Sequence, residues 1–460
     1  MIRRACLLVC GLAWSATSIG PPAAAQSAFA FRVVATGLNA PWEIAIGPDS
    51  YLWVTERIGR RIVRVEPATG RVVPAVTIDE SYDPGRTWHE GVLGLALHPD
   101  LLEGAGSDYV YVAYTYDADA GRALARRLKV RRYTYNPEAQ SLAAPVDVIA
   151  DLPANDDHGG GRLVIGPDRT LYLTRGDHGS NWLDNACLPN PAQVLPTAAQ
   201  IAARDWSSYG GKILRMNLDG TIPEDNPLLN GVRSHVFSYG HRNPQGLQFG
   251  PTGLLYSSEH GPGTDDELNL IEAGGNYGWP HIAGYRDDRG YVYANWSASA
   301  GVPCASLTFD EFDPPPSVPR HLESEWTGAF TPPLRTFFTV PEEYDPRESG
   351  SATIAAAGLE VYAAGGIPGW ATSILQTGMT TGRVYRVTLS EDGRTAVGES
   401  EELFRAANRY RDLAVGPGGR TFYLATDNDG FGQTLDLNDA RVDTFANPGA
   451  IVEFTYRPAR

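Results

Sequence analysis

Two polar clusters lie at either end of a predicted β-hairpin between residues 239 and 267. His241-Arg242-Asn243 precedes the first apolar stretch, the turn Gly250-Pro251-Thr252-Gly253 follows it, and Glu259-His260-Gly261-Pro262 ends the second stretch. Because a hairpin returns the chain to its starting point, the two clusters must meet. A cation and amides would then face carboxylates and backbone carbonyls, which suits a ligand that is both anionic and bound to a metal ion.

His158 is the candidate for proton transfer. It lies in the glycine-rich segment DDHGGGR of residues 156–162, directly before an apolar stretch. Histidine ordinarily titrates near neutrality, so His158 could act as a general base, and a carboxylate such as Asp177 could orient it. A lone histidine in a loop is more often a surface residue. Its expected position beside Arg242, on the rim described below, favours a catalytic role.

A repeated pattern must position these residues. An apolar strand, a turn and a second strand ending in polar residues recur from residues 44, 95, 163, 247 and 413, with a degenerate copy from residue 359. Repeats of roughly 40 to 50 residues that are rich in short strands are typical of β-propellers. The six copies predict an all-β fold, a six-bladed β-propeller.

The ends of the repeated hairpins indicate where a site would form. Residues before each first strand and after each second strand lie at one end of a hairpin, and a propeller brings those ends to one face. Polar residues would therefore converge on one rim, where ligand pockets usually lie. Two long loop insertions, residues 185–205 and 272–347, would cover this face or form the contact of a homodimer. Only residues 192–203 have the pattern of a short helix.

The N-terminus predicts export. Residues 1–25 contain two arginines, an apolar run from residue 5 to residue 14, and three alanines before Gln26, the pattern of a cleaved secretory signal peptide. The apolar run is too short to span a bilayer, and no later stretch is long and apolar enough to do so. We therefore expect residues 26–460 to form one propeller domain that is periplasmic or secreted.

The charge of the chain excludes several partners. The formal net charge is −16, and loss of the two N-terminal arginines would make it −18, so nucleic acid and anionic membrane surfaces are unsuitable partners. Acidic clusters could instead hold Ca²⁺. Cys187 and Cys304 would remain after cleavage, and in an oxidising compartment they could form one disulfide or stay as two buried thiols.

Long motifs, taken in chain order, resemble a known family. They are DHGGGRLVIGPD, GDHG, GGKILRMNLDG, GHRNPQGL, EHGPGTDDELNLI, GGNYGWP, ESEWTG and NRYRD. Nearly the whole chain after residue 25 resembles the soluble glucose dehydrogenases that use pyrroloquinoline quinone (PQQ), within the glucose/sorbosone dehydrogenase family. The resemblance implies a six-bladed propeller with PQQ and Ca²⁺ at its mouth. Such an enzyme oxidises the anomeric C1 hydroxyl of a sugar to the lactone and passes electrons to an external acceptor.

The resemblance also implies roles for individual residues. His158 would remove the hydroxyl proton, Asp177 would lie beside it, and Arg242 would support negative charge on the quinone. The implied PQQ contacts are Asn243, Gln245, Thr353, Arg409 and Arg411, and the implied sugar contacts are His89, Leu183 and Asp266. The carbonyls of Gly261 and Pro262 would hold a Ca²⁺ that binds with PQQ. A second Ca²⁺ would be held by Glu267, Tyr277, Ala283, Tyr285, Asp287 and Glu323, whose acidic members could equally be solvated loop charges.

This chain departs from the pattern of that family in three places. A lysine that contacts the cofactor aligns with Thr380, and a glutamine that contacts the sugar aligns with His89. The loop of residues 342–353 is shorter and lacks the Trp and Cys of the family's loop over the quinone. These departures predict weaker retention of PQQ and a wider mouth that admits disaccharides or varied aldoses.

Two other functions are compatible with such a propeller. One is a Ca²⁺-dependent hydrolase of the lactonase type, which would need several metal-ligating carboxylates and Asn at the central channel. The other is a non-catalytic propeller that binds a sugar or a partner and has lost PQQ. Incubation with PQQ, Ca²⁺ and sugars separates the three, because only the dehydrogenase would reduce a dye.

Overall fold

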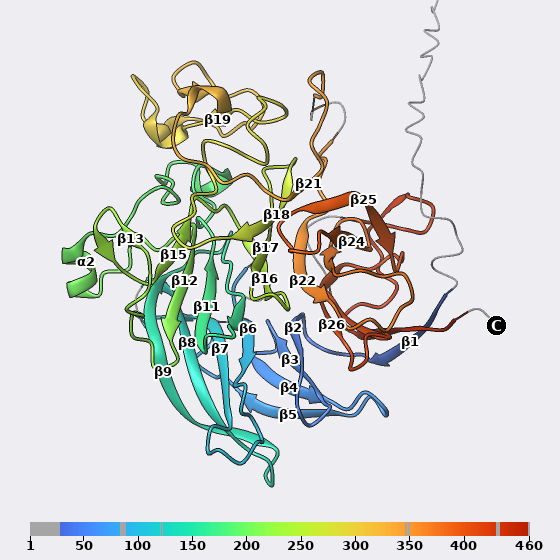
Figure 1. The fold of residues 1–460 in the computed structure, drawn as a ribbon. Helices are drawn as coiled ribbons and strands as arrows, with labels where there is room; N and C mark the ends of the chain where they lie inside the picture. The colour runs from blue at the N-terminus through green and yellow to red at the C-terminus, as the bar shows by residue number, and fades with distance from the viewer. Residues whose placement is uncertain are drawn as a thin grey trace, which may run out of the picture.

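The computed structural model describes residues 28–82, 89–119, 121, 123–345, 347, 350–428 and 433–458. The expected signal peptide lies outside these ranges. Six four-stranded sheets are arranged around a central axis, and the innermost strand of each sheet contacts those of its two neighbours (Figure 1). The prediction of a six-bladed β-propeller is confirmed. No helix in the described ranges is long and apolar enough to cross a membrane.

The strands of each blade follow one another from the innermost outward. Blade 1 contains β2 (Pro41–Ile46), β3 (Leu52–Glu56), β4 (Arg61–Val65) and β5 (Val72–Thr77). Blade 2 contains β6 (Val92–Leu97), β7 (Tyr109–Asp117), β8 (Arg126–Asn136) and β9 (Ser141–Pro153), and blade 3 contains β10 (Leu163–Ile165), β11 (Thr170–Arg175), β12 (Lys212–Asn217) and β15 (Val236–Tyr239). Blade 4 contains β16 (Pro244–Phe249), β17 (Leu255–Glu259), β18 (Asp266–Ile271) and β21 (Arg335–Phe337). Blade 5 contains β22 (Ala356–Tyr362), β23 (Ser373–Gly378), β24 (Arg383–Leu389) and β25 (Ala396–Leu403), and blade 6 contains β26 (Tyr410–Val415), β27 (Thr421–Thr426), β30 (Ile451–Tyr456) and β1 (Phe29–Ala35).

The repeated pattern in the sequence corresponds to the two innermost strands of every blade. In blade 4 the register from Pro244↔Glu259 to Phe249↔Leu255 forms the predicted hairpin, and Gly253 in its turn has a φ of 80°, which favours glycine. Every residue of β11 and β17 is buried, because each strand lies inside its sheet and between neighbouring blades. The polar residues that end these strands are therefore held by a packed framework.

The two ends of the described chain close the ring. β1 pairs with β30 from Phe29↔Tyr456 to Ala35↔Ile451, so the outer strand of blade 6 comes from the start of the propeller. The Phe29 ring also packs against Phe404 and Phe422, at centroid distances of 5.0 and 5.9 Å. Blade 6 is thus completed by both termini, and its apolar core includes residues from each.

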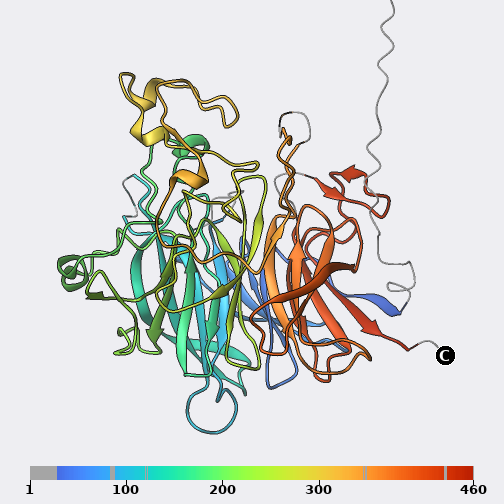
Figure 2. The ribbon, with the colours of Figure 1, turned by 45° about the horizontal axis from the view of Figure 1, so that its top comes forward.

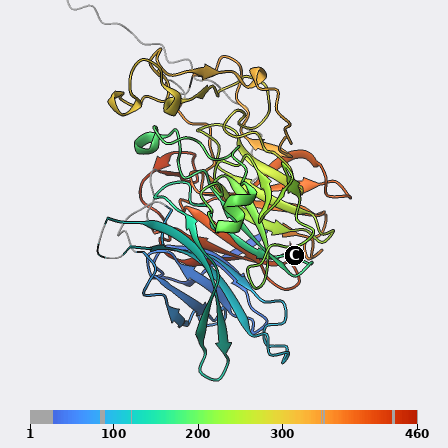
Figure 3. The ribbon, with the colours of Figure 1, turned by 90° about the vertical axis from the view of Figure 1, so that its left-hand side faces the viewer.

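The 272–347 insertion projects beyond one end of the blades (Figure 2, Figure 3). It carries β19 (Tyr293–Ala294), η2 (Trp296–Ala298), η3 (Cys304–Ser306), β20 (Arg320–His321) and η4 (Glu323–Glu325) before it returns to the sheet as β21. The other short elements are η1 (Leu183–Asn185), α2 (Ala198–Ala203), β13 (Leu228–Leu229), β14 (Val232–Arg233), β28 (Thr434–Leu435) and β29 (Arg441–Val442). Loops rather than helices therefore form most of the cover over this end.

The helix predicted at residues 192–203 is wrong in its first half. Only Ala198–Ala203 is helical. Pro196 disfavours a helical conformation in the residue before it, and Thr197 caps the helix: its side chain accepts a hydrogen bond from the N–H of Gln200, and its own N–H donates to Oε1 of Gln200.

Cys187 and Cys304 form a disulfide, with their Cα atoms 5.7 Å apart. The bridge joins the first insertion to the second across 117 residues of sequence. Of the two alternatives that the sequence left open, the structure contains the disulfide. It ties together the two segments that reach over the same end of the propeller.

Removal of the disulfide should lower the free energy of unfolding. A Cys187→Ser/Cys304→Ser variant should lose about 2–4 kcal/mol, because a bridge between distant residues restricts the unfolded chain. Denaturant-induced unfolding of the variant and of the parent protein measures the difference. The parent protein in reductant should have the same free energy of unfolding as the variant. Equal free energies for the parent, the reduced parent and the variant would show that the bridge does not stabilise this fold.

Candidate active site

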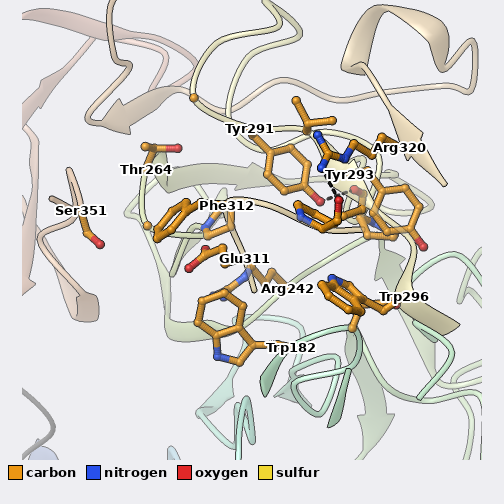
Figure 4. Close-up of a pocket in the computed structure, with 18 of the residues that line it drawn as sticks. Trp182, Arg242, Thr264, Tyr291, Tyr293, Trp296, Glu311, Phe312, Arg320 and Ser351 are labelled. Carbon is orange, nitrogen blue, oxygen red and sulfur yellow. Dashed lines mark hydrogen bonds between the residues drawn. The ribbon is translucent and has the colours of Figure 1, made fainter. Parts of the chain in front are cut away.

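A cavity of about 380 Å³ lies at the end of the blades that the 272–347 insertion covers (Figure 4). His158 comes from the loop before β10, Arg242 from the loop before β16, and Pro262 from the loop after β17. Much of the remaining wall is aromatic: Trp182, Trp279, Tyr291, Tyr293, Trp296, Phe309 and Phe312. Loops from blades 3 and 4 and the 272–347 insertion therefore meet at one cavity.

His158 and Asp177 form a buried, hydrogen-bonded pair. Nδ1 of His158 lies 2.6 Å from Oδ1 of Asp177. Gly176 permits this approach, because a Cβ at that position would lie 1.9 Å from the carbonyl oxygen of His158. Since the carboxylate accepts the Nδ1 proton, Nε2 of the neutral imidazole keeps a lone pair that can take a proton.

The Asp177 carboxylate is satisfied from four sides. Its donors are Nδ1 of His158 at 2.6 Å, the N–H of Gly179 at 3.0 Å, Nδ2 of Asn190 at 2.8 Å and Nε1 of Trp279 at 2.6 Å. Burial opposes ionisation of Asp177, but the nearby His158 and Arg242 and the Trp279 hydrogen bond outweigh it and lower its pKa. Asp177 therefore stays charged and keeps His158 in one orientation.

Glu259 fixes the backbone that carries Arg242. Its carboxylate accepts hydrogen bonds from the N–H groups of Arg242 and Asn243, and lies 3.0 Å from Nδ1 of His241. Burial raises the pKa of Glu259, although the two N–H groups act in the opposite direction. The N–H of His260 donates to the carbonyl of Asn243 at 3.2 Å. The meeting of the two polar clusters, predicted from the hairpin, is thus observed.

Buried hydrogen-bond donors near the expected cofactor position fit an anionic group. Nε of Arg242, Nδ2 of Asn243 and Nη1 of Arg411 are buried and make no hydrogen bond with any residue that the structure describes. Nη2 of Arg411 meanwhile pairs with Asp427 at 2.9 Å. Because unsatisfied buried donors are costly, carboxylates of a ligand at these positions would stabilise the protein.

Two further residues expected to contact PQQ bond within the protein. Nε2 of Gln245 donates to Oδ1 of Asn243 at 2.7 Å. Arg409 is buried, and its Nη2 lies 3.9 Å from the sulfur of Met379. Both side chains are therefore held by their surroundings, and their contact with a cofactor stays a prediction.

Thr353, Asp266 and Thr380 are linked by hydrogen bonds. Oγ1 of Thr353 donates to Oδ2 of Asp266 at 2.6 Å, and Oγ1 of Thr380 donates to the carbonyl of Thr353 at 3.0 Å. Asp266 also accepts from the N–H groups of Gly261 and Ile354, at 2.8 and 2.7 Å. Burial raises the pKa of Asp266 to about 6. Thr380 thus makes a neutral contact with the chain, at the position where the resemblance implies a lysine.

The expected sugar contacts lie at different depths. The His89 ring is 6.3 Å from the His158 ring, and burial lowers the pKa of His89 to about 3, with help from the positive charges around it. Asp266 is buried, whereas Leu183 is 44 % exposed. The described residues that line the cavity do not include His89, Asp266 or Leu183. Contact of these three residues with a sugar therefore stays a prediction.

The expected Ca²⁺ ligands differ in what surrounds them. Gly261 must be glycine, because a Cβ there would lie 1.9 Å from the carbonyl oxygen of Thr264, and Pro262 faces the cavity. Among the residues expected to hold the second Ca²⁺, Glu323 accepts hydrogen bonds from the N–H groups of Ala283 and Asp287, at 2.9 and 3.1 Å. Burial raises the pKa of Glu323 to about 7.

The other residues expected to hold the second Ca²⁺ are also bonded within the protein. Oε1 of Glu267 accepts from the N–H of Gly284 at 2.7 Å, and the Tyr277 hydroxyl donates to the carbonyl of Leu270 at 2.5 Å. Tyr285 is half-buried. Within the described ranges, no group of three or more His, Cys, Asp or Glu side chains could hold a metal ion. Ca²⁺ at either position stays a prediction.

Some residues of the site carried no signal in the sequence. Asn190 and Glu311 lie on the two insertions, and Trp182 lies three residues before the first of them, where no repeat and no spacing relates these residues to His158. Trp279 lies within the motif GGNYGWP, which marks it only as part of a family pattern. The one signal in the sequence that could have placed the insertions was the pair Cys187 and Cys304, because a disulfide between them brings the two insertions together.

Comparisons with known proteins agree with this arrangement. The family model described as Glucose / Sorbosone dehydrogenase matches residues 38–317 and 329–434. The chain is 41 % identical over 440 residues to quinoprotein glucose dehydrogenase B of Acinetobacter calcoaceticus, over 93 % of this chain and 91 % of that protein. The PQQ-bound form of an aldose sugar dehydrogenase from Streptomyces coelicolor is similar in structure, with a TM-score of 0.62 and 27 % identity over 93 % of this chain and 98 % of that one.

A further solved structure supports the fold alone. The apo-form of the soluble aldose sugar dehydrogenase of Escherichia coli has a TM-score of 0.63 at 22 % identity, over 93 % of this chain and 100 % of that one. The family match includes His158, Arg242 and Arg411, whereas Glu323 falls in the unmatched stretch of residues 318–328. The resemblance that the motifs predicted is confirmed: this chain belongs to the glucose/sorbosone dehydrogenase family.

Proposed function

We propose that this chain is an exported, PQQ- and Ca²⁺-dependent aldose dehydrogenase that oxidises the anomeric C1 hydroxyl of a sugar to the lactone. The observation that carries the proposal is the buried His158–Asp177 pair, which shares one cavity with Arg242. Relatives that are a quinoprotein glucose dehydrogenase and a PQQ-bound aldose sugar dehydrogenase support the choice of cofactor and substrate. The electrons would pass to an external acceptor.

The residues of the cavity have complementary chemical roles in this proposal. PQQ, when bound, supplies the two-electron acceptor for the hydride of C1. His158 takes the hydroxyl proton on Nε2, so that a C=O bond forms at C1. Asp177 remains ionised and stabilises the resulting imidazolium. Arg242 provides positive charge for a developing oxyanion.

The residues that would hold the cofactor differ in chemical type. Arg409 and Arg411 suit its carboxylates, because a guanidinium binds a carboxylate through two parallel hydrogen bonds. Asn243, Gln245 and Thr353 would add neutral hydrogen bonds. The carbonyls of Gly261 and Pro262 would bind Ca²⁺, a Lewis acid for the same cofactor.

The central channel does not favour the lactonase alternative. A hydrolase of that type needs carboxylates available for a metal ion. In this channel, Nη1 of Arg162 lies 2.7 Å from Glu43 and 2.8 Å from Asp412, so both carboxylates already pair with a cation. Glu360, a third channel carboxylate, accepts hydrogen bonds from Gln248 at 3.2 and 3.3 Å.

Reconstitution tests the proposed function directly. The purified protein should reduce a dye with aldoses after incubation with PQQ and Ca²⁺, and should form the corresponding lactone. Product analysis by mass spectrometry and dye reduction measure the two halves of the reaction. Lactone hydrolysis without PQQ, or binding of sugar without any oxidation, would replace the proposal with one of the two alternatives.

Loss of the imidazole should stop proton transfer. His158→Ala should lower turnover by roughly two to four orders of magnitude, because a positioned general base contributes about that much. PQQ titration should show unchanged binding in the same variant. His321→Ala, at an exposed position, is the matched control. Near-normal turnover of His158→Ala would remove this residue from the mechanism.

Affinity for PQQ should follow the positive charge around it. Arg411→Ala should nearly abolish PQQ binding, because the change removes the buried donor Nη1 that would bind a carboxylate of PQQ. Thr380→Lys should tighten binding by about tenfold or more, since one hydrogen bond to a charged group contributes about 1.5–3 kcal/mol. Spectroscopic titration with PQQ measures both changes, and parent-like binding by Arg411→Ala would show that PQQ does not occupy this rim.

Ca²⁺ at Gly261 and Pro262 should depend on PQQ. Two backbone carbonyls supply too few oxygens for Ca²⁺, which takes six to eight ligands, so the cofactor must complete the site. Calorimetric titration should show a tight Ca²⁺ site only when PQQ is present. A Glu323→Gln variant identifies heat from the expected second Ca²⁺ site, and a tight site that persists without PQQ in this variant would contradict the prediction.

A further inference from the structure

The second insertion places an acidic and an aromatic side chain in the outer wall of the cavity. Both Glu311 and Phe312 line the cavity that contains His158 and Arg242. Figure 4 shows Glu311 between Phe312 on one side and Arg242 and Trp182 on the other. This wall belongs to the insertion and not to the blades.

The outer wall is held at a fixed position relative to Arg242. Phe309, two residues before Glu311, packs against Trp296 and Trp182 with ring centroids 5.0 and 5.6 Å away. The Trp182 ring in turn lies 5.9 Å from the Arg242 guanidinium. The disulfide at Cys304 ties the same apolar cluster to the first insertion.

No contact within the described part of the chain accounts for the position of the Glu311 carboxylate. It makes no hydrogen bond and no ion pair with any residue that the structure describes. Burial raises its pKa to about 7, while Arg242 acts in the opposite direction. Phe312 is 41 % exposed although it lines a cavity. The carboxylate is half-buried, makes no hydrogen bond or ion pair with the described residues, and lies beside an exposed ring. This combination suits a ligand that has both hydroxyl groups and apolar faces.

We propose that Glu311 and Phe312 form an outer sugar subsite, which binds the second unit of a disaccharide whose reducing unit is oxidised at His158. This inference rests on the proposed function. The reducing unit must present its C1 hydroxyl to Nε2 of His158, so a second unit linked to it extends toward the insertion. There the carboxylate accepts hydrogen bonds from sugar hydroxyls, and the phenyl ring packs against the C–H face of the pyranose.

Specificity kinetics on the PQQ-loaded holoenzyme test this subsite. In Glu311→Gln and in Phe312→Ala, kcat/KM for maltose should fall about tenfold, mainly through KM. The first change weakens a hydrogen bond to a charged group, and the second removes the ring that packs against the pyranose. The value for glucose should change less than about twofold, since glucose has no second unit. The matched controls are Glu343→Gln and Phe338→Ala, exposed residues outside this cavity wall. Thermal unfolding of each variant verifies that it folds.

A binding measurement separates this inference from the proposed function. Methyl β-maltoside and methyl β-glucoside have no free anomeric hydroxyl, so calorimetry reports their binding without turnover. The parent should bind the maltoside more tightly, and Glu311→Gln should lose that advantage. Equal binding of the two glycosides by the parent, or equal losses for maltose and glucose in the variants, would overturn the subsite. Failure of any sugar to be oxidised, with the maltoside preference intact, would overturn the dehydrogenase proposal and leave a sugar-binding wall.

Discussion

The Asp177 carboxylate is the group on which the rest of the site depends. It is completely buried, and its four donors come from the loop before β10, the loop after β11, the first insertion and the start of the second. A buried charge is tolerated only when such donors and a nearby cation are in place. The interaction that orients His158 therefore also anchors both insertions over the cavity. Loss of any one donor would disturb the imidazole and the cover together.

Arg242 is constrained in a related way. Its positive charge lowers the pKa of both Asp177 and Glu259. Without it, the negative charges of these two buried carboxylates would oppose each other's ionisation. Glu259 holds the backbone of Arg242 through its N–H group, so the cation and its counterion are fixed by the same strand pair. The guanidinium thus has a structural reason to remain in the cavity. Positive charge is present there before any ligand arrives.

Much of this arrangement could be predicted from the sequence. The six repeats determine the blades, and hairpin geometry requires residues 241–243 to meet residues 259–262, because these contacts are local in the chain. His158 and Asp177 flank one such hairpin. Asn190 and Trp279 could not be placed in this way, since they reach Asp177 from irregular insertions whose path depends on long-range packing. The false helical turn at residues 192–197 has a local cause, the restriction imposed by Pro196.

The ring and the insertions contribute differently to recognition. Inner strands are packed on both sides, so the positions of His158 and Arg242 tolerate little change, whereas irregular loops can vary in sequence without loss of the fold. The two parts are nevertheless coupled in this chain, because Trp182 packs against Phe309 of the outer wall and against Arg242 of the inner site. A change in the insertion that shifts Phe309 must move Trp182, and through it the environment of the guanidinium. The proposed selectivity for a second sugar unit and the proposed stabilisation of negative charge would therefore share one aromatic contact.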